Sequence, residues 1–229
     1  ELQVLRAGGD DEASVFTNMY HIQTHRRVRA LHRLGDAAEA GSLRSRTLSE
    51  LFVPLVWLFL LPNQSGGIDM NMANEALACI RRMATHLQWG HYYYWLKRFL
   101  RQLKEHAGKD ETSASERLHV RGIVGVLEAF HFPMDEDVEM SDDPIADESS
   151  TQAPPHAIAH DLTHDAADAR SLPRAQRLAL ATTLTTRVLP PLYEALATKD
   201  EDRLPARLPL LIGTARLAMY LPSDRRNVE

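Results

Sequence analysis

The sequence predicts an all-α fold: a HEAT-like α-solenoid segment of antiparallel helix pairs with an acidic disordered insertion. Three observations support this prediction. Apolar residues recur at helical spacing along most of the 229 residues. Only 11 glycines stand among many Ala, Leu and Arg residues, which disfavours an all-β sandwich with its many turns. Pairs of predicted helices begin at regular intervals, near residues 47, 89 and 171.

The interval between pairs points to a repeat architecture. The first two pairs begin 42 residues apart, and the next interval is 45 residues once the 37 residues of segment 133–169 are set aside. A period of about 40–47 residues made of two helices is typical of HEAT repeats. A generic α-helical bundle is the alternative that this spacing leaves open.

The first three helices each have an apolar stripe. Residues 24–40 form the first helix, which Gly41-Ser42 ends. Residues 47–61 form the second, with Ser45 or Thr47 as its cap; its apolar run is shorter than the roughly 20 residues of a membrane span and suits a buried helix. Residues 69–87 form the third helix. Three of its polar residues are expected to face water: Asn74, Glu75 and Arg82.

The next two helices are predicted to pack closely. The fourth follows residues 88–90 and ends near 106. Its apolar face consists of Tyr92, Trp95, Leu96, Phe99 and Leu103. We expect Trp89 and Trp95 to lie in the seam between neighbouring repeats. The fifth helix, 115–130, contains Gly122 and Gly125, which weaken it by about 1 kcal/mol each relative to Ala but permit a close helix crossing.

Two further helices, 171–198 and 204–221, complete the pattern. Pro54 and Pro190 each lie inside the first helix of a pair, where HEAT helices often bend. Pro209 is expected to kink the last helix or to delay its start. Arg207, which follows Asp200 and Asp202, fits the inward-pointing arginine of such repeats.

Composition divides the chain into five regions. These are an irregular lead-in (1–23), HEAT-like repeats (24–132), an acidic flexible insertion (133–169), further HEAT-like repeats (170–222) and a tail (223–229). The insertion holds eleven acids, no Lys or Arg, and at most a short helix near 158–168, so it buries too little apolar surface to offset its ordering entropy. The rest of the chain has 26 Lys and Arg against 20 Asp and Glu, which suggests a polyanionic partner or a charged tether.

Motifs typical of enzymes are absent from the sequence. It has no Gly-rich phosphate loop, His-Glu-x-x-His motif or nucleophile elbow, so we expect no enzyme and no cofactor. Cys79 lies in an apolar stretch and is expected to be buried rather than nucleophilic. His156, His160 and His164 would share one face of a helix and could bind zinc or nickel. Solvated, low-complexity residues are the preferred interpretation, so no metal site is predicted.

Two basic faces are the candidate surfaces for RNA or a partner protein. They comprise Arg26, Arg27, Arg29 and Arg33 in the first helix and Lys97, Arg101 and Lys104 in the fourth. Tyr93 and Tyr94 flank the second face. Guanidinium groups bind phosphate through two hydrogen bonds, and tyrosine stacks on unpaired bases. A solvated polar face is the alternative for each helix.

The order of several sequence blocks resembles the DRIM family, a nucleolar family of very large HEAT-repeat proteins. The first block is the segment Ile22–Leu34, with the sequence Ile-Gln-Thr-His-Arg-Arg-Val-Arg-Ala-Leu-His-Arg-Leu. The later blocks are 51–55, 74–77, 86–89, 92–100, 199–202, 207–209 and 221–222. The similarity covers most of residues 15–105 and 184–222, and the acidic insertion has no counterpart in it.

The resemblance implies a nuclear and nucleolar, non-enzymatic scaffold. The family is a component of the small-subunit processome; it associates with U-three small nucleolar RNA particles and early pre-ribosomes, and it is needed for small-subunit rRNA processing. It has no catalytic residues to carry over. The chain begins without Met and shows no signal peptide, so we expect a fragment of a longer solenoid that binds pre-ribosomal RNA and processome proteins. The rival hypothesis is a protein-only adaptor in transport or trafficking.

Overall fold

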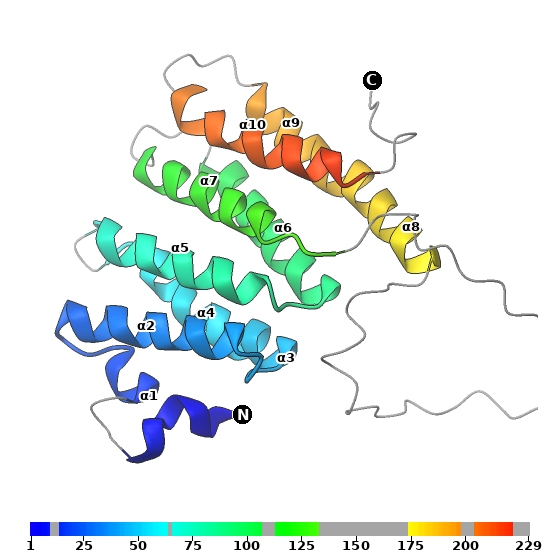
Figure 1. The fold of residues 1–229 in the computed structure, drawn as a ribbon. Helices are drawn as coiled ribbons and strands as arrows, with labels where there is room; N and C mark the ends of the chain where they lie inside the picture. Colours follow the sequence, from blue (N-terminus) through cyan, green and yellow to red (C-terminus); the bar gives the residue numbers. More distant parts are fainter. Residues whose placement is uncertain (10–13, 64–65, 107–112, 133–173, 198–203, 222–229) are drawn as a thin grey trace, which may run out of the picture.

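The helices of the chain alternate between two layers (Figure 1). The computed structural model describes residues 1–9, 14–63, 66–106, 113–132, 174–197 and 204–221, and every regular element in these ranges is helical. The first layer consists of α2 (Thr24–Glu39), α5 (Met70–Ala84), α7 (Ser113–Glu128) and α10 (Leu204–Met219). The second layer has three helical stretches. The first runs through α3 (Ser45–Thr47), η2 (Leu48–Phe52), α4 (Val53–Trp57) and η3 (Leu58–Leu60), and the second is α6 (Trp89–His106). The third runs through α8 (Arg174–Thr183), η5 (Leu184–Val188) and α9 (Leu189–Leu196).

Neighbouring helices of the first layer pack side by side, α2 against α5, α5 against α7, and α7 against α10. Contacts of α4 with α5, α6 with α7 and α9 with α10 join the two layers. The pairs begin at Ser45, Trp89 and Arg174, close to the predicted starts. The prediction of an all-α solenoid of helix pairs is therefore confirmed.

The core lies between the two layers and is made of the predicted apolar stripes. Leu31 and Leu34 of α2 are fully buried, as are the five residues expected on the apolar face of α6. Within the second layer, the rings of Trp57 of α4 and Phe99 of α6 lie 4.6 Å apart. Each fully buried Leu or Phe side chain contributes about 1.5–3 kcal/mol to the free energy of unfolding. Hydrophobic burial between the layers therefore holds the repeats together.

The close crossing predicted at Gly122 is present. A Cβ atom at this position would overlap the ring of Phe99, so only glycine lets α7 lie so near α6. Trp95 is buried, and its indole nitrogen donates a hydrogen bond to Ser49 Oγ at 3.0 Å, as expected for a residue in the seam between repeats. Trp89 is half-buried and stacks on the Tyr93 ring at 5.5 Å.

The second-layer helices accommodate Pro54 and Pro190 in the same way. Each proline follows a π-helical turn, η2 in one helix and η5 in the other. The N–H of Val53 donates to the carbonyl of Leu48, five residues back, and the N–H of Leu189 donates to Leu184 in the same manner. Proline lacks an N–H and clashes with the carbonyl four residues before it, and the wider turn relieves that clash. Both prolines thus lie where the repeat helices were expected to deviate.

The structure differs from the sequence expectations at three places. The described residues before Thr24, which are 1–9 and 14–23, are not wholly irregular, because they contain η1 (Leu2–Gly9) and α1 (Val15–Asn18), which place Leu5 and Val15 in the core. Ser45 does not cap its helix; its hydroxyl instead accepts the Gln88 N–H at 2.7 Å and thereby joins two repeats. The last helix begins at Leu204 without delay and continues through Pro209, which lies inside the helix and, having no N–H, leaves the carbonyl of Pro205 without its usual helical partner.

The inward-pointing Arg207 is confirmed, but its partner is new. Arg207 Nε lies 2.7 Å from Glu116 Oε1 of α7, and both side chains are buried. The acids that sequence reasoning placed beside this arginine, Asp200 and Asp202, lie outside the described residues. The pair connects α10 to α7 within the first layer, and it adds a charged contact to the apolar packing between them.

Several expectations lie outside the described residues. These are the acidic insertion (133–169), the short helix near 158–168, the tail (223–229) and the histidines His156, His160 and His164. Among the helices that are described, none is long and apolar enough to cross a membrane.

Candidate RNA- or partner-binding surfaces

The arginines of α2 do not form a single free basic face. Arg29 is exposed, whereas Arg26 and Arg33 are partly buried and each already interacts with another group of the chain. Arg27 lies apart from these three. Its Nη2 donates to Thr24 Oγ1 at 3.1 Å, and its Nε is buried without a hydrogen-bond partner. Of the predicted α2 group, Arg29 is therefore the member best placed to meet a ligand.

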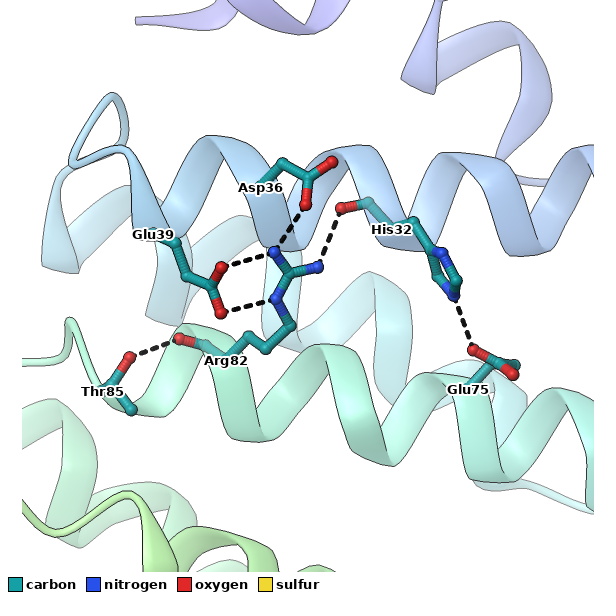
Figure 2. Close-up of polar contacts among 6 residues, drawn as sticks. All are labelled: His32, Asp36, Glu39, Glu75, Arg82 and Thr85. Carbon is teal, nitrogen blue, oxygen red and sulfur yellow. Dashed lines mark hydrogen bonds and ion pairs between the residues drawn. The ribbon is translucent and has the colours of Figure 1, made fainter.

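The acids of α2 are bound by Arg82 of the neighbouring helix α5 (Figure 2). Arg82 Nε and Nη2 donate to the two oxygens of Glu39 at 2.7 and 2.6 Å, and Nη2 also donates to Asp36. These bonds lower the pKa of the Glu39 carboxyl and raise that of the Arg82 guanidinium. A second contact joins the same helices, since His32 Nε2 lies 2.9 Å from Glu75 Oε2.

This network adds to the expectation that Glu75 and Arg82 face water. Both residues bind α2 across the boundary between repeats, and the side chain of Arg82 is only 24% exposed. The partners are separated by 43 residues in the pairs Arg82–Glu39 and Glu75–His32, which is close to the repeat interval. Complementary charges one period apart on successive first-layer helices are thus the sequence signal that could have predicted them.

The basic face of α6 is exposed as predicted. Lys97, Arg101 and Lys104 all face solvent, opposite the buried stripe of the same helix. Lys104 Nζ lies 3.8 Å from Glu194 Oε1 of α9, and with both side chains at least 70% exposed this pair contributes little to stability. A ligand phosphate could replace the Glu194 contact at low cost, so the face is available for binding.

Sequence reasoning missed one cation of this face. The Arg98 guanidinium lies 4.9 Å from the centroid of the Trp57 ring and 5.4 Å from that of Trp95, a cation–π geometry that holds it near the helix surface. Tyr94, which is 53% exposed, packs edge-on against Trp95 beside it. The face therefore has an exposed aromatic ring next to its cations, which is the combination that single-stranded nucleic acids bind.

The two basic helices lie in different layers. α2 belongs to the first layer and α6 to the second, with the core between them (Figure 1). A single ligand that contacts one layer face would therefore not contact the other face at the same point of the solenoid. The candidate residues form two separate surfaces rather than one site.

Cys79 is buried as predicted, and burial raises the pKa of its thiol to about 12, so the reactive thiolate is not populated at neutral pH. In the described part of the chain, no three His, Cys, Asp or Glu side chains come close enough to hold a metal ion.

Two known proteins match the sequence. U3 small nucleolar RNA-associated protein 20 of Schizosaccharomyces pombe is 29% identical over 225 residues, which are 98% of this chain and 8% of that protein. The protein of the same name from Saccharomyces cerevisiae is 34% identical over 104 residues, 45% of this chain and 4% of that protein. The chain is similar to U3 small nucleolar RNA-associated protein 20. The family resemblance expected from the order of the sequence blocks is therefore confirmed.

The similarity to U3 small nucleolar RNA-associated protein 20 includes both basic helices. Because the Schizosaccharomyces match covers nearly the whole chain, α2 and α6 both fall within it. The chain spans less than a tenth of the length of either relative. No protein-family model matches the chain.

Proposed function

We propose that this chain is a structural scaffold segment of the small-subunit processome, the early pre-ribosome, which supports pre-rRNA processing and small-subunit biogenesis. The observation that carries the proposal is the exposed face of α6, where Lys97, Arg98 and Arg101 lie beside Tyr94 in a relative of a small nucleolar RNA-associated protein. The segment acts without catalysis, in the nucleus and nucleolus, by binding pre-ribosomal RNA and processome proteins.

The two-layer architecture supports a scaffolding role. In a solenoid each repeat contacts mainly its neighbours, so both outer faces remain available to partners along the whole length. Arginine and lysine bind the phosphate backbone without reading the sequence, and a neighbouring tyrosine adds stacking on an unpaired base. The α6 face offers these groups on a rigid helix whose opposite side is fixed in the core.

Charge reversal combined with a salt titration tests this function. The double variant Lys97→Glu/Arg101→Glu should bind a single-stranded pre-rRNA oligonucleotide more weakly than the unchanged chain does. The slope of the logarithm of its affinity against the logarithm of the salt concentration should become shallower by about 0.7–1 for each lost phosphate contact. The α2 variant Arg26→Glu/Arg29→Glu/Arg33→Glu provides a comparison on the other layer. Its slope should change less, because Arg26 and Arg33 are already engaged within the chain.

The alternative function is a protein-only HEAT adaptor in transport or trafficking without RNA contact. It predicts weak RNA binding in the unchanged chain and the same salt slope in all variants. Normal association of both variants with pre-ribosomal particles, together with unchanged slopes, would show that the basic residues form ordinary solvated faces and would favour the adaptor.

A further inference from the structure

A groove crosses the first layer where α5, α7 and α10 meet. Its volume is about 270 Å³, and its apolar lining comes from Leu77 of α5, Val124 and Gly125 of α7, and Pro209 of α10. Small-molecule sites usually occupy about 300–1,000 Å³ and enclose most of their ligand. This groove is smaller than such a site, and its size suits one large side chain of a peptide.

The edge of the groove has more positive than negative charge. Arg81 Nη1 lies 3.3 Å from one oxygen of Glu128, and Arg216 Nη1 lies 3.6 Å from the other. Both arginines are more than half exposed, so these long contacts are weak. Arg121 donates at 2.8 Å to the neutral side chain of Asn74. Three guanidinium groups and one carboxylate thus lie in or beside the groove.

Exposed apolar surface continues beyond the groove along α10. Ile212 is 59% exposed and stands three residues after Pro209 and four before Arg216, a spacing that puts these side chains on one helix face. Ile212 thus adds exposed apolar area to the helix face that carries Pro209 and Arg216.

We propose that this groove binds an acidic peptide segment of a partner protein, with one large apolar side chain held against Val124 and Pro209. Flanking carboxylates of the peptide would pair with Arg121, which donates to the neutral Asn74 side chain, and with Arg216, which makes a long, exposed contact with Glu128. The lining favours a peptide over RNA, because it is aliphatic and unpaired bases bind best to aromatic rings and hydrogen-bonding edges.

The proposal is separate from RNA binding at α6, because the groove lies on the other layer of the solenoid. Two double variants with the same charge change distinguish them. Arg121→Glu/Arg216→Glu alters the groove, and Lys97→Glu/Arg101→Glu alters the α6 face. All four residues are exposed, so both variants should keep the thermal midpoint of the unchanged chain.

The probe is a short fluorescein-labelled peptide in which Asp and Glu residues flank a single Phe, and its binding to the 229-residue chain is followed by fluorescence anisotropy. The groove variant should bind the probe with a Kd about tenfold or more higher than that of the unchanged chain, and the α6 variant should keep the Kd within about twofold. A probe in which Ser replaces Phe should bind the unchanged chain as weakly as the Phe probe binds the groove variant. A single-stranded RNA oligonucleotide is titrated in parallel.

Three outcomes would overturn the proposal. The first is equal loss of peptide affinity in both variants, which would indicate attraction by net charge alone. The second is loss of RNA rather than peptide binding in the groove variant. The third is peptide binding that arises only after residues 133–169 are replaced by a Gly-Ser linker, since the acidic segment of the chain itself would then be the competing ligand.

Discussion

Replacing one partner of the buried pair Arg207–Glu116 should destabilise the chain strongly, whereas replacing both partners by apolar residues should restore part of that stability. The arginine Nε lies 2.7 Å from Glu116 Oε1, and Nη1 donates to the carbonyl of Ala195 at 2.9 Å. The two side chains are only 7% and 4% exposed. Arg207→Met keeps most of the stem and removes the guanidinium, which leaves the Glu116 carboxylate without its arginine in a place that water scarcely reaches.

The expected cost follows from this burial. Removing one partner of a buried ion pair typically costs about 3–5 kcal/mol, since the remaining charge stays desolvated. Replacing both partners by apolar residues of similar volume is often neutral. The double variant Arg207→Met/Glu116→Leu should therefore be more stable than Arg207→Met alone by about 2 kcal/mol or more, a coupling well above the usual error of additivity.

Urea unfolding of the single and double variants, followed by circular dichroism, measures this coupling. Arg216→Met serves as a control, because it removes an exposed arginine from the same helix and should change the free energy of unfolding by no more than about 0.5 kcal/mol. If the double variant is as unstable as Arg207→Met, the desolvated carboxylate is not the source of the cost and the reasoning is refuted.

Three further perturbations test the packing and the bridges between repeats. Gly122→Ala should destabilise the chain by about 1–3 kcal/mol because its methyl group would overlap Phe99, and equal stability in a melting experiment would show that the two helices can move apart freely. Trp95→Ala should cost about 3–5 kcal/mol in urea unfolding because this side chain is buried, and a cost below 1 kcal/mol would contradict its place in the core. The pKa of Glu39 is lowered from 4.5 in the fold by Arg82, so the stability it adds is present above pH 4.5 and is lost as the pH falls through the folded pKa. The difference in stability from Glu39→Gln should thus vanish in acid, and a difference that persists there would exclude this linkage.

The helix faces were predictable from the sequence because they depend on local spacing. The five residues expected on the apolar side of α6 are all buried, and the cations expected opposite them are exposed. Pro54 and Pro190 also act locally, since each affects only the turn before it. The basic face of α6 was accordingly located correctly, whereas Arg98 was missed because its position depends on Trp57, a residue of another helix.

The α2 face shows where local reasoning stops. Arg26, Arg29 and Arg33 share a side of the helical wheel, but only the structure shows that Arg26 and Arg33 already interact with other groups. The wheel also gave no reason to pair Asp36 and Glu39 with Arg82, because these residues come from helices one repeat apart.

The sequence by itself determined that the chain is helical, where most helices begin and end, and which side of each helix is apolar. These properties follow from hydrogen bonds and side-chain spacing within a few residues. Only the tertiary structure decided that α2 and α6 present their cations on separate layers, that Arg207 pairs with Glu116, and that residues of three helices line an open groove with arginines at its edge. The Arg207–Glu116 partners are 91 residues apart, and the stacking of repeats brings them together through burial that no local pattern specifies.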